Sequence, residues 1–575
     1  MKNKDNLDHL KDFINYLIFR DKSFFSLIIV YGCIISLLNL ALPLSIQVLI
    51  TSIIYTAQIT PVLILGLILL FLISFSALLN VLQKFLIEIY KRHSFVRIVS
   101  DILLKAIYSN YKDFKFYNNS SLSSRYFEIF NLQRNAAELI VEGLLVCLTI
   151  IVSFILSSFY HPYFFILNII ILFIIWLSWK VFTNRAVYYA LELSEAKFNV
   201  FAWVCNVFKL TSFFKSQFNK NYALSKGAIL INNYIKARGN YWRISFMQLI
   251  ILTLLYIIIT VTLVVIGSIL VIKGQLSLGQ LVAAEILYTT SLYGVSKLSI
   301  YYDKYYNLMA SVDEISRIFL IDNENLSSKS DNVVNNNASN SNIIINFNNV
   351  IFNDYLGQHY FFDFCIYKKE LNFILTTNQN IQNIFINLIH QDFYPYKGAI
   401  EFSGVNSIYY DQHYIRDKVY IINDANIFES TIDEFINFGL TNLDYKHIDS
   451  ILELTGLRNI FNKLPEGSLT FLRNDGYPLN EAYIILLKIV KAILVNPEVI
   501  LISDIFDRID KEIQKNLLMY IKNNTMITLV CFSANYNINS NLEYDKFFIL
   551  DNQNSKQFNS IDEFKNIVKI TFLGS

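Results

Sequence analysis

A short apolar run followed directly by hydroxyl and acidic side chains stands out within residues 496–510. Residues 499–502 are Val-Ile-Leu-Ile, which predicts a buried strand. A carboxylate directly after such a strand can hold Mg²⁺ on nucleotide phosphates, and the next acidic residue can serve as a general base in phosphoryl transfer. Ser503 occupies the first position and Asp504 the second. The stretch therefore has the setting for phosphoryl-transfer chemistry without its metal ligand.

A phosphate-binding loop would have to lie between an earlier strand and the helix that follows it. Its pattern is G-x-x-x-x-G-K-[ST], in which glycines let backbone N–H groups converge on phosphates, lysine supplies charge and the hydroxyl binds magnesium. Residues 374–384 stand in the corresponding place, and Gly-Lys occurs nowhere in the chain. The two glycines of this pattern fall on Thr376 and Ile381, the lysine on Gln382 and the hydroxyl on Asn383, while Gln379 is a further glycine position that the family resemblance described below implies.

The first half of the chain has the composition of a membrane protein. Of the 575 residues, 54% are hydrophobic and only 16% are charged, while a net charge of +2 gives no basis for nucleic-acid binding. Residues 24–83 and 143–179 contain no Asp, Glu, Lys or Arg. Because each run exceeds the roughly 20 residues of one membrane helix, each predicts a hairpin of two. The six predicted spans are about 24–54, 61–90, 138–159, 162–183, 244–272 and 277–303.

Basic residues are concentrated in the two long connections, between spans two and three and between spans four and five. This asymmetry places both connections and both termini in the cytoplasm. Residues 1–22 are charged and amphipathic, which predicts an interfacial helix before the first span. Glu285 and Lys297 interrupt the last apolar stretch. They are candidates for a transport pathway, with pairing inside the bundle or a place near the membrane boundary as the alternative.

The second half of the chain changes character after an Asn- and Ser-rich linker at residues 321–341. From residue 342 to residue 575, short apolar runs alternate with helical segments, which predicts one α/β domain. The cysteines are far apart and show no Cys-x-x-Cys spacing, so a disulfide framework or zinc site is not expected and a redox switch is the minor alternative. They are Cys33, Cys147, Cys205, Cys365 and Cys531.

Several segments together resemble half-transporters of the ATP-binding cassette (ABC) exporter type. The resemblance implies a six-helix transmembrane bundle followed by a cytoplasmic α/β P-loop-like ABC ATPase domain. Segments in the first half are similar to bacterial peptide, toxin and type I protein secretion exporters. In the first half they are 42–47 (LPLSIQ), 158–162 (SFYHP) and 278–285 (LGQLVAAE); in the second they are 394–400 (YPYKGAI), 427–439 (IFESTIDEFINFG), 464–468 (LPEGS) and 490–497 (VKAILVNP).

The resemblance also implies where the nucleotide site should be, and the residues there depart from the family pattern. Asn423 replaces the Q-loop glutamine, and Glu481 brings a carboxylate into the signature, where a partner's γ-phosphate should sit. Asp504 is one methylene shorter than the general-base glutamate. No histidine follows His447, so the switch position holds Cys531 or Phe532. The remaining positions are Leu479, Asn480 and Ala482 of the signature, Asp510 of the D-loop and Tyr355 near the adenine-stacking aromatic.

These departures predict a nucleotide-binding domain in which no catalytic residue is intact. We expect intrinsic ATP hydrolysis to be lost, with ATP and Mg²⁺ bound weakly or at a partner's site. The predicted function is an export subunit for peptide, protein or lipid-like cargo that works with an active half-transporter. We expect a heterodimer rather than a homodimer. The predicted location is a bacterial inner membrane, and the further predicted partners are membrane lipid and a secretion-system component. The alternatives are a non-catalytic membrane scaffold and a decaying exporter.

Overall fold

The computed structural model describes residues 22–38, 41–56, 59–110, 124–324, 342–376, 378–440, 444–535, 543–552 and 554–568. The chain divides into two compact units, Met1–Glu324 and Asn325–Ser575. The amphipathic helix predicted for residues 1–22 lies outside the described ranges except for its last residue. The linker predicted for residues 321–341 lies outside them from residue 325 onward.

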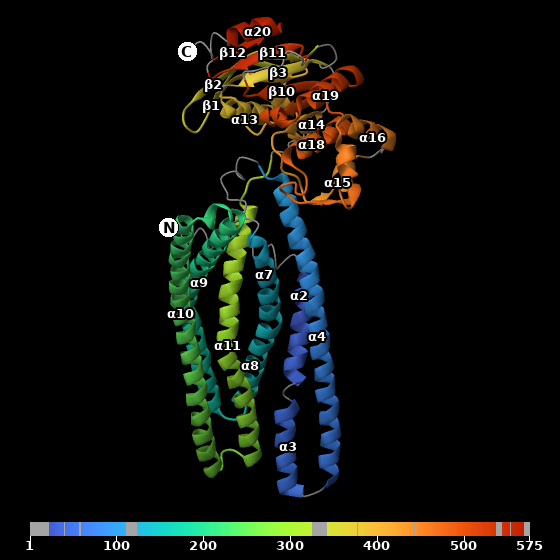
Figure 1. Ribbon diagram of the computed structural model, residues 1–575. Helices are drawn as coiled ribbons and strands as arrows, with labels where there is room; N and C mark the ends of the chain where they lie inside the picture. Colours follow the sequence, from blue (N-terminus) through green and yellow to red (C-terminus); the bar gives the residue numbers. More distant parts are fainter. Residues whose placement is uncertain are drawn as a thin grey trace. The chain divides into compact units, whose positions relative to one another are not determined.

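The first unit is a bundle of long helices (Figure 1). The helix α11 is central, since it packs against α3, α7, α8, α9 and α10. The elements of the unit are α2 (Lys22–Leu38), α3 (Ala41–Thr56), α4 (Ile59–Tyr108), η1 (Arg125–Phe127), α7 (Glu128–Glu138), the π-helical η2 (Leu139–Gly143), α8 (Leu144–Ser158), α9 (Pro162–Lys209), η3 (Phe213–Lys215), α10 (Gln217–Ile272) and α11 (Leu278–Phe319).

Among the described residues, five helical stretches are long and apolar enough to cross a membrane. The helix α11 is not among them, although its first part was predicted as the sixth span. Its central position explains its polarity, because a helix that packs on five others meets protein rather than lipid. The helix α4 has 50 residues and is therefore about 75 Å long, well beyond the roughly 30 Å of a hydrocarbon core. The five stretches are Ser26–Ile50, which runs over α2 and α3, Val62–Tyr108, Arg125–Ser158, Pro162–Lys209 and Gln217–Ile272.

The second unit is built on three sheets. The largest has the strand order β12-β11-β3-β10-β9-β6, in which β11, β3, β10, β9 and β6 are parallel. An antiparallel sheet has the order β2-β1-β4-β5, and β7 pairs with β8. The strands are β1 (Ile343–Asn353), β2 (His359–Tyr367), β3 (Leu371–Thr376), β4 (Lys397–Phe402), β5 (Val405–Asn406), β6 (Val419–Ile422), β7 (Ser430–Thr431), β8 (Phe471–Leu472), β9 (Val499–Ile502), β10 (Thr528–Ser533), β11 (Lys546–Leu550) and β12 (Ser555–Phe558).

Helices cover both faces of the largest sheet. Alternate residues of a strand point to opposite faces, so Ile500 and Ile502 join one core while Val499 and Leu501 join the other. All four residues of β9 are completely buried. The helical segments are α13 (Gln379–Ile389), η4 (Ser407–Tyr409), α14 (Gln412–Lys418), α15 (Ile432–Asn437), α16 (Tyr445–Leu454), α17 (Leu457–Phe461), η5 (Gly467–Leu469), α18 (Glu481–Val495), η6 (Asp504–Arg508), α19 (Lys511–Asn524) and α20 (Ile561–Val568).

A buried lysine joins two of these helices. Lys491 of α18 is only 4% exposed, and its Nζ donates hydrogen bonds to the backbone oxygens of Ile436 and Phe438 at the end of α15. A cation at a helix C-terminus meets the carbonyls that have no partner within the helix. Burial lowers the pKa of Lys491, but the two hydrogen bonds hold its donors in place.

We predict that Lys491→Met destabilises the second unit by about 2 kcal/mol, because the carbonyls of Ile436, which is buried, and Phe438 lose their donor. In a domain of this size the change corresponds to roughly 4–8 °C in melting temperature. The measurement is protease resistance of the full chain in detergent during heating. Lys418→Met is the matched control, because Lys418 pairs with Glu498 at the surface and should contribute less than about 1 kcal/mol. Equal effects of the two changes would contradict the prediction.

Candidate nucleotide site and polar cavity

The carboxyl ends of four neighbouring strands bring most of the predicted nucleotide-site residues to one edge of the sheet. The strands β3, β10, β9 and β6 are parallel and adjacent, so Thr376, Ser533, Ser503 and Asn423 follow or end them side by side. Ligands of open α/β sheets bind outside this edge. The site predicted from the sequence is therefore at the position where the fold would place a ligand.

The connection from β3 to α13 is too short to form a phosphate-binding loop. Thr376 ends β3 and Gln379 begins α13, which leaves two residues between them. Of these, Asn378 is extended, and its side chain accepts a hydrogen bond from the backbone N–H of Asn380 at 2.9 Å. Its carbonyl accepts another from the N–H of Ile381. Two of the N–H groups that would face a phosphate are thus bound within the chain.

The residues at the phosphate-loop positions lie in a regular helix. Ile381 is completely buried and Gln382 is 2% exposed, so both belong to the core face of α13. The Oε1 of Gln382 is buried and has no hydrogen-bond partner. Asn383 is exposed, and its carbonyl accepts a hydrogen bond from the Asn387 side chain. None of the described residues between 376 and 383 has a positive φ, the conformation for which glycine is favoured.

The position expected to bind magnesium is used as a helix cap. Ser503 is 1% exposed, its N–H donates to the carbonyl of Ile422 at 2.9 Å, and its Oγ accepts from the N–H of Ile505. Asp504 begins η6 and is partly exposed. Asp507, which the sequence did not single out, accepts a hydrogen bond from Ser533 Oγ at 2.7 Å. Burial raises the pKa of the Asp507 carboxyl group, the bond from Ser533 opposes the shift, and Asp504 adds to it.

The strand register moves the predicted switch position. Cys531 pairs with Ile502, one residue before Ser503, and is 1% exposed within β10. Phe532 is equally buried, and the strand ends at Ser533. The predicted switch residues Cys531 and Phe532 therefore lie inside the strand, and Ser533 and Ala534 are the residues at its carboxyl end. Burial raises the pKa of the Cys531 thiol.

The signature segment caps and begins α18. Leu479 is buried, and the Asn480 side chain accepts a hydrogen bond from the N–H of Tyr483 at 2.9 Å. Glu481 is the first residue of α18, and its carboxylate accepts a hydrogen bond from the guanidinium of Arg508, a residue that the sequence reasoning missed. Ala482, the next residue, is partly exposed.

The remaining predicted residues are exposed or take part in local contacts. Asn423 is exposed after β6, and the next residue, Asp424, pairs with Lys488 of α18 at 2.7 Å. Asp510 caps α19 by accepting from the N–H of Glu512 at 2.8 Å. Tyr355 is 75% exposed in the connection between β1 and β2. The described contact of Asp510 is thus a helix cap, which is a structural role.

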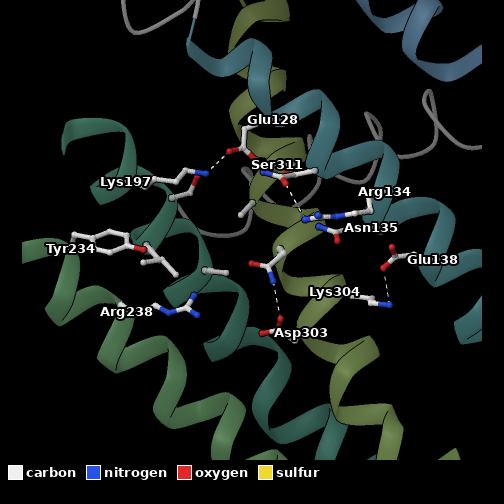
Figure 2. Close-up of a pocket in the computed structure, with 16 residues that line it drawn as sticks. Glu128, Arg134, Asn135, Glu138, Lys197, Tyr234, Arg238, Asp303, Lys304 and Ser311 are labelled. Atoms are coloured by element: carbon white, nitrogen blue, oxygen red, sulfur yellow. Dashed lines mark hydrogen bonds and ion pairs between the residues drawn. The ribbon is translucent and has the colours of Figure 1, made fainter. Parts of the chain in front are cut away.

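A polar cavity of about 460 Å³ lies within the helical unit (Figure 2). The helix α7 contributes polar side chains at helical spacing, and α9, α10 and α11 close the other sides. Neither Glu285, which is exposed, nor Lys297, which lies 4.4 Å from the centroid of the Tyr293 ring, lines it. The recurrence of polar residues along α7 and α11 was the sequence signal for it. The charged lining residues are Glu128, Arg134, Glu138, Lys197, Arg238, Asp303 and Lys304.

The charges of the cavity do not cancel, since four of its side chains are cationic and three are acidic. Lys304 pairs with Glu138 at 2.7 Å, and Lys197 pairs with Glu128. Arg134 contacts the amide oxygen of Asn131 at 3.3 Å, and Arg238 forms no ion pair among the described residues. The cavity therefore presents two guanidinium groups without a carboxylate partner.

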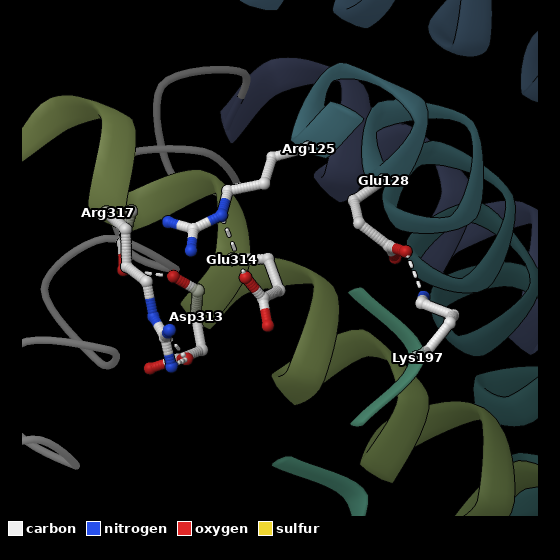
Figure 3. Close-up of polar contacts among 7 residues, drawn as sticks. Arg125, Glu128, Lys197, Asp313, Glu314 and Arg317 are labelled. Carbon is white, nitrogen blue, oxygen red and sulfur yellow. Dashed lines mark hydrogen bonds and ion pairs between the residues drawn. The ribbon is translucent and has the colours of Figure 1, made fainter. Parts of the chain in front are cut away.

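Buried ion pairs close one side of this region (Figure 3). Glu128 accepts a hydrogen bond from Ser311 at 2.7 Å in addition to its contact with Lys197. Arg125 lies 3.2 Å from Glu314, whose side chain is 2% exposed. Burial raises the pKa of Glu314, while Arg317 and Arg125 oppose the shift. These pairs join η1 and α7 to α9 and α11.

Comparisons with known proteins agree with this architecture, although no family model matches the chain. The chain is 24% identical over 169 residues to ABC transporter B family member 7 of Dictyostelium discoideum, which is 29% of this chain and 20% of that protein. It is 23% identical over 142 residues to the multidrug resistance-like ATP-binding protein MdlA of Buchnera aphidicola, or 24% of each chain. The matched stretches thus span a quarter or less of these relatives. A bacterial Atm1-family ABC exporter with ATP bound superposes with a TM-score of 0.78 at 15% identity, covering 96% of this chain and 97% of that chain.

The chain therefore has the fold of an ABC exporter: long membrane-spanning helices followed by an α/β unit of the nucleotide-binding-domain type. Its homologues in sequence are ABC transporters of the B family, MdlA and Atm1-like proteins. The fold class and the family resemblance predicted from the sequence are confirmed.

We predict that Cys531 does not react with iodoacetamide in the native protein, since it is buried and its pKa is raised. Cys365, which is partly exposed, should react first and serves as the internal reference. Mass spectrometry of labelled peptides from the full chain in detergent measures both sites. Rapid labelling of Cys531 would contradict the register and return it to the edge of the sheet.

Proposed function

We propose that this chain is the non-hydrolysing subunit of an ABC exporter and works with a half-transporter whose phosphate loop is intact. The observation that carries the proposal is the two-residue connection between Thr376 and Gln379. Phosphoryl transfer depends on positioning and charge stabilisation. A chain without the phosphate-binding loop, its lysine and the metal-binding carboxylate has none of the groups that supply this positioning and charge stabilisation.

The other edge residues support the same proposal. Ser503 Oγ and the Asn378 side chain bind backbone N–H groups of the chain itself, so they are engaged where a nucleotide would need them. Asp504 alone cannot replace both a metal ligand and a general base. ATP and Mg²⁺ would then be bound by the partner. The complex would lie in a bacterial inner membrane, with the C-terminal unit of this chain in the cytoplasm.

We predict that the purified full chain does not hydrolyse Mg²⁺-ATP, whereas its complex with an active half-transporter does. Changing the partner's phosphate-loop lysine to alanine should lower the rate at least about a hundredfold. Asp504→Asn in this chain should leave the rate within about twofold.

Phosphate release from complexes purified in detergent measures these rates. Hydrolysis by this chain alone, lost in Asp504→Asn, would refute the proposal. Stable purification without any ABC subunit would favour the alternative of a membrane scaffold.

We further propose that the cargo is hydrophilic and carries negative charge. The cavity is lined by amide, hydroxyl and charged groups, and Arg134 and Arg238 are available for a carboxylate or phosphate. A lipid tail would leave these groups desolvated without a partner. Of the cargo classes predicted from the sequence, a peptide or protein segment therefore fits the cavity better than a lipid-like molecule.

We predict that triglutamate raises the melting temperature of the full chain in detergent and that trilysine does not. Arg134→Gln and Arg238→Gln should each weaken triglutamate binding about tenfold, as expected when a charge-assisted contact is lost. Lys236→Gln is the matched control, because Lys236 is exposed on α10 and does not line the cavity. An equal loss in the control would show that net charge, rather than the cavity, determines binding.

A further inference from the structure

The pair formed by Arg508 and Glu481 connects two segments that lie far apart in the sequence. Arg508 ends η6, the turn directly after β9, and its Nη1 donates to Oε2 of Glu481 at the start of α18. Both side chains remain accessible, with 53% of the arginine and 64% of the glutamate exposed. The pair is therefore open to any group that approaches this face.

We infer that Arg508 binds the terminal phosphate of the nucleotide carried by the partner half-transporter, and that Glu481 holds the guanidinium in place until that phosphate arrives. The inference rests on the proposed function, in which this face meets the partner's phosphate loop. It removes the main objection to that function, because Glu481 alone would repel the phosphate. With Arg508 beside it, the net charge of the Arg508–Glu481 pair itself is close to zero.

The guanidinium has the chemistry for this exchange. It carries five N–H donors in a planar fork, and the contact with Glu481 uses Nη1 only. A phosphate can accept two of these donors at once, and such bidentate bonds are stronger than a single contact with an exposed carboxylate. Because exposed ion pairs contribute little to stability, transfer of Arg508 from Glu481 to a phosphate requires little free energy.

The local structure does not need Arg508 for its own stability. The N-terminus of α18 is capped by the Asn480 side chain, and Glu481 in the first turn already favours the helix dipole. The end of η6 is held by Gln514, whose Nε2 donates to the carbonyls of Phe506 at 2.7 Å and Ile509 at 3.0 Å. A structural role is thus filled by other residues, which leaves the exposed guanidinium for a ligand.

The test is the affinity of the partner's site for a fluorescent ATP analogue in the purified complex, measured with Mg²⁺ and with a partner variant that binds but does not hydrolyse ATP. Arg508→Gln should weaken binding of the ATP analogue about tenfold, and the affinity of Arg508→Lys should lie between those of Arg508→Gln and the wild type. Glu481→Gln should tighten binding several-fold, because it frees the guanidinium. These opposite signs would not arise from a structural role. Arg458→Gln is the matched control, since Arg458 forms an exposed pair with Asp449 elsewhere in the unit.

The outcomes separate the inference from the function on which it rests. If the complex forms and hydrolyses ATP, but Arg508→Gln binds the analogue like Arg458→Gln, the inference is wrong and the proposed function stands. If Glu481→Gln weakens binding, the inference is also wrong. If the wild-type chain forms no complex with a half-transporter that has an intact phosphate loop, the proposed function fails, and the inference fails with it.

Discussion

Backbone hydrogen bonds between parallel strands buried on both faces hold the C-terminal unit together. Each strand from β11 to β9 is paired on both sides, and β6 pairs with β9 at the edge of the sheet. Val499 to Ile502 can be wholly apolar because helices or the second sheet cover both sides. None of this depends on a nucleotide. The ligand edge consists of the few residues that follow the strands, so the chemistry there can change while the two cores on either side of the sheet remain intact.

The residues at this edge show how backbone groups are satisfied where the sequence has no glycine-rich loop. A nucleotide-binding edge leaves N–H groups and carboxylates directed at a ligand. Here Asn378, Ser503, Asn480 and Asp510 each direct a side-chain oxygen to a backbone N–H of the same chain. The donors are satisfied locally as helix caps. This pattern follows from the preference of short polar residues for cap positions, and it explains why the strands and helices persist without the glycine-rich loop.

The fold could be predicted from the sequence because apolar runs and ordered motif segments carry it over most of the chain. The positions after β3, β9 and β6 were also predictable, since the carboxyl ends of parallel strands share an edge. The register of β10 was not, because a run of buried residues such as Cys531 and Phe532 looks the same one or two positions along. Arg508 was missed for a different reason, because only tertiary structure brings it to Glu481. The polar residues along α7 and α11 were visible in the sequence, but the contribution of α9 and α10 to the same cavity was not.

The mutual satisfaction of unusual residues bears on whether the chain is a working subunit or a decaying one. Breaking a buried ion pair is strongly destabilising because it leaves one charge without a partner. The Glu314 side chain is almost fully buried, yet Arg125 lies 3.2 Å away, and Glu128 has both Lys197 and Ser311. Random substitution would remove one partner of such an ion pair more often than it would supply a missing one. Several buried polar atoms of the described residues lack a hydrogen-bond partner, among them Gln382 Oε1 and Glu314 Oε2. Even so, a cation lies beside each of the two buried carboxylates, which favours a chain whose structure is still maintained, as the proposed non-hydrolysing subunit requires.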